Sequence, residues 1–216
     1  TIPWDGRTDD GILVEGTFTA VYRVDYEKGN RPQAVSSPVT VDVSPPAVAV
    51  VLDPLPFSPD NDGVDDELQI RMDVRDISEI QAWRFEVPDR NDRFFTEFVG
   101  RGMPADEVTW DGRAADGERV ISAEDYPFIL TISDTLGNFT TVEGTIPIDI
   151  LVVRDGDRLK VQIPSITFEP NSPNLVTDAS TARGEKNAAI LVRLAEIFTK
   201  YGNYSVVIEG HAVNET

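Results

Sequence analysis

Trp110-Asp111-Gly112-Arg113-Ala114-Ala115-Asp116-Gly117 repeats an octapeptide that begins 106 residues earlier, and this repeat is the main indication of the fold. Its large aromatic side chain suits a strand end in a core, and its Asp-Gly pairs suit tight turns in which glycine takes a positive φ. The spacing is about the length of one β-sandwich module. The repeat therefore predicts tandem β modules. Its structural residues in the two copies are Trp4, Asp5, Gly6 and Arg7, and Trp110, Asp111, Gly112 and Arg113.

Each octapeptide is followed by an alternating apolar strand, Phe18 to Val24 in the first copy and Tyr126 to Ile132 in the second. We expect residues 1–43 to be the closing strands of a module whose start is missing, with a last strand from Val39 to Val43. Ser44-Pro45-Pro46 (44–46) is then a stiff linker. A complete immunoglobulin-like β-sandwich is expected over 47–150. Its predicted strands are 47–52, 68–74, 80–87, 93–99, 126–133 and 138–147.

The Trp-Asp-Gly-Arg turn before a late strand resembles the immunoglobulin-like domain of flagellar hook-capping proteins and related surface modules. The resemblance covers roughly residues 1–30 and 47–148. It implies a fold and says little about function.

The charge of the chain excludes several classes of partner. The net charge is −19, and residues 1–150 carry 30 acidic and 12 basic side chains. Such an excess opposes nucleic acid and anionic lipid, which need clustered Lys and Arg. The chain has no cysteine and a single histidine, which excludes thiolate and multi-histidine metal sites. The longest apolar run, Ala47 to Leu52, is far too short to span a membrane.

Residues 56–67, Pro-Phe-Ser-Pro-Asp-Asn-Asp-Gly-Val-Asp-Asp-Glu, form a candidate calcium loop. Calcium prefers six to eight oxygen ligands. Asp60, Asp62, Asp66 and Glu67, with a main-chain carbonyl near Val64, are the candidate ligands for a structural calcium ion, and no other cofactor is expected. The alternative is an acidic hairpin in which Asp and Asn only favour turns. The segment is similar to a Pro-Asn-Gly-Asp-Gly-x-Asn-Asp turn of secreted β-modules in gliding and surface proteins.

The carboxy-terminal segment, 151–216, has a different character. An Asp-Gly turn at 155–156 predicts a hairpin. Apolar residues at spacings of three and four predict an amphipathic helix over 187–201, stopped by Gly202-Asn203. Residues 204–210 then suggest a strand. A strand, a helix and a second strand parallel to the first make one crossover unit. This part is therefore expected to be a partial α/β unit of the β-α-β type.

Ile166-Thr167-Phe168-Glu169-Pro170-Asn171-Ser172, the helix and the Val-x-Ile-Glu-Gly-His stretch resemble the beginning of the OmpA-like domain. The match covers about 163–213, roughly the first half of such a domain. The resemblance implies an α/β sandwich that associates with peptidoglycan and anchors outer-membrane proteins to the wall. Val213 stands where the family has the Asp that contacts the diaminopimelate of the peptide stem, and the family's partner Arg, on the second helix, would lie beyond Thr216. Peptidoglycan binding is therefore expected only through the complete domain.

The sequence thus predicts a non-enzymatic structural protein of the bacterial cell envelope, periplasmic or associated with the outer membrane. In this interpretation a stalk of β modules leads to an OmpA-like, wall-associating domain, with envelope proteins as further partners and no direct membrane span. The alternative is an acidic protein–protein interaction module of a surface or filament-associated assembly, without peptidoglycan binding. No catalytic residues are predicted, because the chain shows no paired-carboxylate signature, phosphate loop or activated nucleophile.

Overall fold

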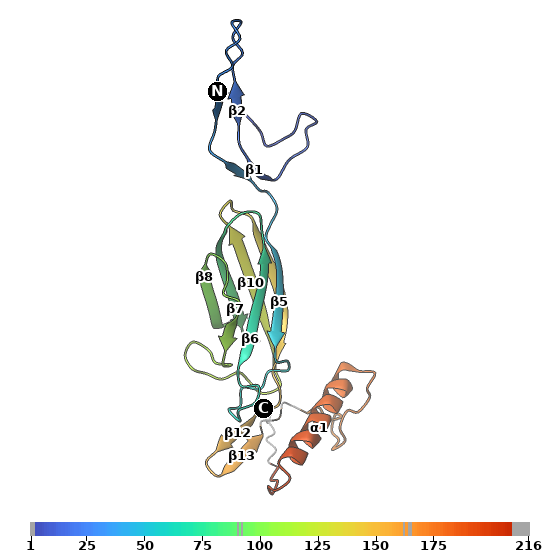
Figure 1. The fold of residues 1–216 in the computed structure, drawn as a ribbon. Helices are drawn as coiled ribbons and strands as arrows, with labels where there is room; N and C mark the ends of the chain where they lie inside the picture. Colours follow the sequence, from blue (N-terminus) through green and yellow to red (C-terminus); the bar gives the residue numbers. More distant parts are fainter. Residues whose placement is uncertain (1–2, 90, 92, 162, 164–165, 209–216) are drawn as a thin grey trace.

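The computed structural model describes residues 3–208 except 90, 92, 162, 164 and 165. This part of the chain is mainly β, with antiparallel pairing in each of its sheets and one helix (Figure 1). In chain order its elements are β1 (Gly16–Phe18), β2 (Val21–Arg23), β3 (Gln33–Val35), β4 (Val39–Val41), β5 (Ala47–Asp53), β6 (Leu68–Arg75), β7 (Ile80–Pro88), β8 (Phe94–Arg101), β9 (Val108–Trp110), β10 (Asp125–Asp134), β11 (Phe139–Pro147), β12 (Val152–Asp155), β13 (Arg158–Val161) and α1 (Ala182–Lys200).

Two sheets enclose the main core. One has four strands in the order β11-β10-β7-β8, and the other has three in the order β5-β6-β9. The six strands predicted from alternation are confirmed as β5, β6, β7, β8, β10 and β11, with ends that differ by at most two residues. The strand β9 was not predicted, because its three residues are too few to show a period.

The core follows the alternation of the strands, since successive side chains of a strand point to opposite faces of its sheet. Tyr126, Phe128, Leu130 and Ile132 are all buried, as the sequence predicts. Phe85 stacks on Phe128 with ring centroids 5.0 Å apart. Burial of these apolar side chains is the main stabilising contribution of the module.

The two octapeptides adopt the same local structure. Indole Nε1 donates to the carbonyl of Arg7 in the first copy and of Arg113 in the second, at 2.8 Å in both. The two glycines that follow Asp5 and Asp111 have φ of 79° and 73°. The surroundings differ, because Trp110 is 3% exposed in the core whereas Trp4 is 51% exposed.

The amino-terminal segment forms two small sheets, β1–β4 and β2–β3. The predicted strand from Phe18 to Val24 is divided between β1 and β2, and its side chains do not line a core: Val21 is 56% and Tyr22 is 60% exposed. The predicted last strand, 39–43, is present over 39–41 as β4. In the described residues this segment therefore contains strands without the core that a complete module would have.

The carboxy-terminal segment corrects part of the prediction. The hairpin β12–β13 is present, and the helix α1 is present but begins at Ala182 because Thr181 caps it, accepting a hydrogen bond from the amide of Gly184 at 3.1 Å. No strand forms over 204–208, and residues 209–210 lie outside the described part. The predicted crossover unit is thus not formed in the described residues, because the apolar stripe of α1 packs elsewhere: Ile190, Leu194 and Ile197 lie in one cluster with Ile150 and Val152.

No helix in the described residues is both long and apolar enough to cross a membrane.

Candidate functional site

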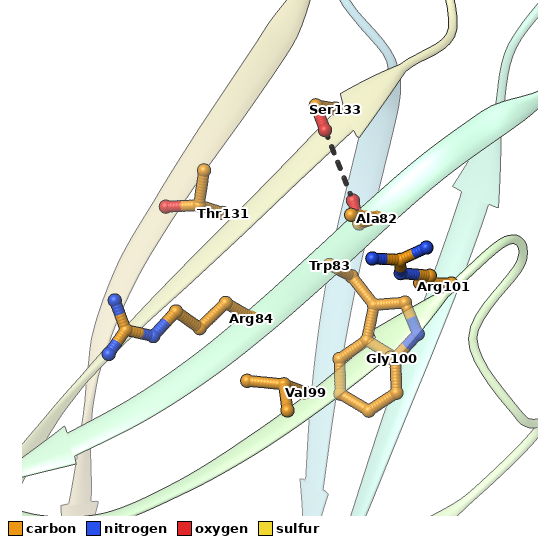
Figure 2. Close-up of a pocket in the computed structure, with 8 residues that line it drawn as sticks. All are labelled: Ala82, Trp83, Arg84, Val99, Gly100, Arg101, Thr131 and Ser133. Carbon is orange, nitrogen blue, oxygen red and sulfur yellow. Dashed lines mark hydrogen bonds between the residues drawn. The ribbon is translucent and has the colours of Figure 1, made fainter.

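A hollow of about 500 Å³ lies on strands β7, β8 and β10 (Figure 2). Its one serine, Ser133, donates a hydrogen bond to the carbonyl of Ala82 at 3.4 Å. No histidine, carboxylate or thiol is among the residues that line it, so these residues offer no acid–base or nucleophile–base pair. The lining residues are Ala82, Trp83, Arg84, Val99, Gly100, Arg101, Thr131 and Ser133.

The acidic loop, defined as residues 58–67, is the stronger candidate. It connects β5 to β6 at the end of the module that faces α1 (Figure 1). Carboxylate oxygens of Asp60, Asp62 and Asp66 lie within 4.8 Å of one another. The structure therefore brings together three of the four predicted ligands, and Glu67 is outside this group.

Backbone amides hold two of the three carboxylates in place. Asp66 accepts hydrogen bonds from the amide of Asn61 through Oδ1 and from the amide of Gly63 through Oδ2, the latter at 2.7 Å. Asp62 Oδ1 accepts from the amide of Val64 at 2.9 Å. The loop thus folds around its own acidic side chains, as the turn interpretation predicts.

Asp60 has a different environment, because it is only 7% exposed. Its Oδ2 accepts a hydrogen bond from the amide of Val152 at 3.0 Å, which ties the loop to the start of β12. Its buried Oδ1 accepts no hydrogen bond. Burial raises the pKa of Asp60, and the charges of Asp62 and Asp66 add to the rise. A buried carboxylate oxygen without a partner is costly, so this atom marks where the loop lacks a positive group.

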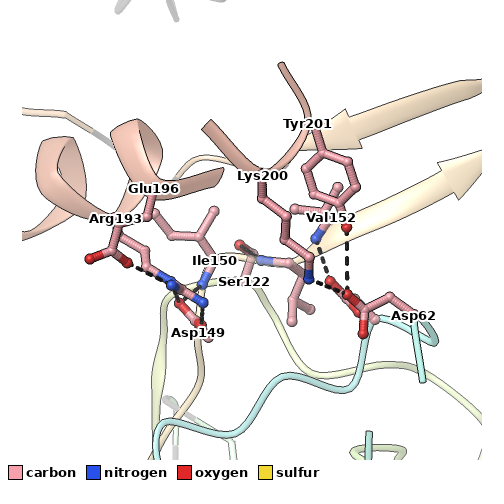
Figure 3. Close-up of polar contacts among 11 residues, drawn as sticks. Asp62, Ser122, Asp149, Ile150, Val152, Arg193, Glu196, Lys200 and Tyr201 are labelled. Atoms are coloured by element: carbon pink, nitrogen blue, oxygen red, sulfur yellow. Dashed lines mark hydrogen bonds and ion pairs between the residues drawn. The ribbon is translucent and has the colours of Figure 1, made fainter. Parts of the chain in front are cut away.

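Helix α1 supplies a cation to the edge of the loop. Lys200 Nζ lies 2.7 Å from Asp62 Oδ2, and the hydroxyl of Tyr201 lies 3.5 Å from the same oxygen (Figure 3). The hydrogen bond from Lys200 is the main cause that lowers the pKa of Asp62, and the same bond raises the pKa of Lys200. Neither residue was predicted from the sequence, since 138 positions separate Asp62 from Lys200 and no local pattern links them.

A second ion pair joins α1 to the module. Arg193 Nε donates to Asp149 Oδ1 at 2.8 Å, and Nη2 of the same guanidinium contacts Asp149 Oδ2 (Figure 3). Asp149 is 8% exposed and follows the last strand of the module. Glu196 contacts Nη1 of Arg193 at 2.7 Å, and these carboxylates raise the pKa of the guanidinium. A two-point contact of this kind sets the orientation of the helix as well as its distance.

A second acidic group lies at the other end of the module. Carboxylate oxygens of Asp42, Asp76 and Asp134 lie within 4.8 Å of one another. Ser78 donates to Asp42 at 2.6 Å, and Asn138 Nδ2 donates to Asp134 at 2.7 Å and to the carbonyl of Asp42 at 3.3 Å. The Ser78 hydroxyl lowers the pKa of Asp42, whereas burial raises the pKa of Asp76. This group joins the segment before the linker to two loops of the module.

Val213, where the OmpA-like family has an Asp, lies outside the described residues. Trp110 is the last residue of β9, and both Trp4 and Trp110 make the contacts with the following residues that are described above.

No protein-family model matches the chain, and no curated protein sequence matches it. Among solved structures the chain is similar to dimeric latent PorU from Porphyromonas gingivalis, with 20% sequence identity and a TM-score of 0.39. The match covers 66% of this chain and 13% of that chain. The chain therefore spans only a small part of PorU, and at this TM-score the likeness carries no functional argument.

Proposed function

We propose that this chain is a non-enzymatic structural protein of the bacterial cell envelope, in which residues 47–150 act as an immunoglobulin-like spacer. In this proposal the carboxy-terminal segment belongs to an OmpA-like, wall-associating domain. The observation that carries the spacer role is that the chain enters the module at one end and leaves it at the other (Figure 1).

Two hydrogen bonds near the ends of β11 mark the two ends of the module. Near its start, the hydroxyl of Thr140 donates to the carbonyl of Pro46, where the chain enters the module. At its end, the carbonyl of Pro147 accepts from the amide of Phe57, next to the point where the chain leaves. The nine residues of β11 span about 30 Å at roughly 3.3 Å per residue. The module thus separates the amino-terminal segment from the carboxy-terminal segment by about that length.

The contact with α1 extends this spacer beyond the module. Arg193 and Lys200 pair with Asp149 and Asp62, and the apolar stripe of the helix packs beside them. Polar and apolar contacts together resist rotation of the carboxy-terminal segment against the module, which is what a load-transmitting connection requires.

Three features of the module support an immunoglobulin-like sandwich. Seven antiparallel strands divide into sheets of three and four, as in that architecture. Tyr126, at the start of β10, accepts a hydrogen bond through its hydroxyl from the amide of Ile121 at 3.1 Å. This is the geometry of the tyrosine corner found in such domains. Trp83, on β7, packs against the core, as a tryptophan of the equivalent strand does there.

Distances between spin labels test the spacer role. The chain has no cysteine, so cysteines introduced as Leu136→Cys and Asp157→Cys can be labelled specifically. These exposed positions lie in turns at opposite ends of the unit formed by the module and β12–β13. We expect one narrow distance distribution centred above about 30 Å. The pair Asp125→Cys and Leu136→Cys, at the first residue of β10 and in the turn that follows β10, gives the width of the distance distribution for a rigid module. A much broader distribution for the first pair would contradict the proposal.

Association with the wall is tested by sedimentation with purified peptidoglycan sacculi. The proposal rests here on the OmpA-like motifs at 166–172 and 206–211, and on the helix between them. Because binding is expected only through the complete domain, we expect clear sedimentation of a version extended through the rest of that domain and little or none of the chain as given. Digestion of the sacculi with lysozyme is the control. If neither protein sediments, the wall-associating role is wrong, and protein partners of the acidic modules become the better explanation.

A further inference from the structure

We infer that Asp60, Asp62 and Asp66 form a Ca²⁺ site, and that the bound ion competes with Lys200 of α1 for Asp62. This inference is separate from the spacer role, because it concerns the charge of the acidic loop and its test does not involve peptidoglycan.

The charge of the group is the first argument. Three carboxylates lie within 4.8 Å of one another, and in the described part of the chain Lys200 is the basic side chain that pairs with them. It reaches only Asp62, at the solvent edge. Carboxylates at this separation repel one another strongly unless a proton or a cation lies between them. Neither Asp60 nor Asp66 has such a partner among the described ion pairs.

The buried oxygen of Asp60 is the second and independent argument. Asp60 is more than nine-tenths buried, and its Oδ1 accepts no hydrogen bond although its Oδ2 does. Backbone amides account for both oxygens of Asp66 and for Oδ1 of Asp62, whereas the buried Oδ1 of Asp60 has no hydrogen bond. A cation bound between the three side chains would give this carboxylate the positive partner that it lacks.

The chemistry of the ligands selects calcium. All three side chains offer oxygen, which hard divalent cations prefer. A short loop of carboxylates and main-chain carbonyls suits the flexible coordination of Ca²⁺ better than the strict octahedron of Mg²⁺. Sites of this kind outside the cytosol bind with a Kd of about 10⁻⁴–10⁻³ M.

Lys200 explains why the ion would compete with α1. Its ammonium lies 2.7 Å from Asp62 Oδ2, so a Ca²⁺ ion bound to Asp62 would meet a like charge at short range. Arg193 and the apolar stripe of α1 do not involve the loop, so the helix stays attached when Lys200 is released. Occupation of the site would therefore release the side chain of Lys200 without undocking the helix, and by linkage the ion pair between Lys200 and Asp62 weakens Ca²⁺ binding.

Calorimetric titration of the full chain with CaCl₂ tests the inference, with three variants. We expect one Ca²⁺ per chain for the unmodified protein. Asp60→Asn should weaken binding at least tenfold, by analogy with the loss of about 10–100-fold when a supporting group of a metal site is removed. Lys200→Ala should bind about two- to fivefold more tightly, as the loss of an exposed ion pair predicts. Lys186→Ala removes the same charge from an exposed position on the first half of α1 and should bind like the unmodified protein.

Folding is monitored separately. Asparagine at position 60 can still accept the hydrogen bond from Val152 and relieves the carboxylate repulsion, so the Asp60→Asn variant should fold. In the absence of calcium, this variant should unfold at a higher temperature than the unmodified protein. Added Ca²⁺ should stabilise the unmodified protein and leave Asp60→Asn unchanged. The inference is overturned if neither the unmodified protein nor Lys200→Ala binds Ca²⁺ at about 10⁻³ M, or if Asp60→Asn binds as well as they do. Equal binding by Lys200→Ala and Lys186→Ala would refute the competition.

Discussion

Substitution of the two equivalent tryptophans separates the local role of the octapeptide from the contribution of core burial. Trp4 and Trp110 make the same 2.8 Å hydrogen bond to the carbonyl three residues later. Trp110 is 3% exposed and packs against Phe57 and Phe95, with ring centroids 5.6 and 6.2 Å away. Trp4 is 51% exposed and has Phe18 beside it at 5.3 Å. The two replacements by alanine are therefore matched in local chemistry and differ in burial.

The size of the effect can be worked out from the buried area. A buried tryptophan removes roughly 200 Å² from water, which at about 25 cal/mol per Å² is worth about 5 kcal/mol. Measured Trp→Ala replacements in cores cost about 3–5 kcal/mol. We expect Trp110→Ala to lower the free energy of unfolding of the module by about 4 kcal/mol, and Trp4→Ala to change it by less than about 0.5 kcal/mol, as for surface sites.

Urea denaturation followed by far-ultraviolet circular dichroism measures both effects. With an m-value of about 2 kcal/mol/M for a domain of this size, Trp110→Ala should lower the midpoint by about 2 M. Equal shifts for the two variants would contradict this prediction, because the shared turn and not the core would then be the stabilising element. A shift below about 0.5 M for Trp110→Ala would likewise show that the indole is not needed in the core.

Three further outcomes are expected. Gly100→Ala should destabilise the module by about 1–3 kcal/mol in urea denaturation, because a Cβ there would lie 2.5 Å from Cε2 and 2.6 Å from Cζ2 of Trp83; unchanged stability would show that the indole can move aside. Arg193→Ala should leave the buried Asp149 without its cation at a cost of about 1–3 kcal/mol. In thermal unfolding, the helical circular dichroism signal at 222 nm should then be lost at a lower temperature than the β module unfolds. A single transition shared by helix and module would contradict this prediction. Arg93 lowers the pKa of Asp89 to about 2. The stabilisation that Asp89→Asn removes is therefore present above about pH 4 and is lost as the pH falls toward 2. Thermal unfolding of both proteins across this range measures the difference in stability, and a difference that grows on acidification would contradict the prediction.

Much of the module could be predicted because its determinants are periodic. The alternation in β10 places every second side chain on one face of the sheet, and Tyr126 to Ile132 are buried accordingly. The strand β9 could not be found in this way, since three residues carry no period. The hydroxyl contact of Tyr126 with Ile121 was missed as well, although a tyrosine at the start of a late strand is a recognisable signal.

The carboxy-terminal segment shows where periodicity is insufficient. The apolar stripe of α1 predicted a helix and a buried face, but it carries no information about which surface covers that face. The prediction assumed a parallel strand at 204–210. In the structure the stripe lies against Ile150 and Val152, and residues 204–208 form no strand.

Features that depend on neighbours within a few positions could be predicted from the amino-acid sequence. The octapeptide turns have the same hydrogen bonds in both copies, and the acidic loop gathers Asp60, Asp62 and Asp66 from a span of seven residues. The burial of Trp110, the exposure of Trp4 and the contact of Lys200 with Asp62 became visible in the three-dimensional fold alone. The physical reason is range: backbone turns form between residues a few positions apart, whereas burial and ion pairing depend on which distant surfaces the packed core brings into contact.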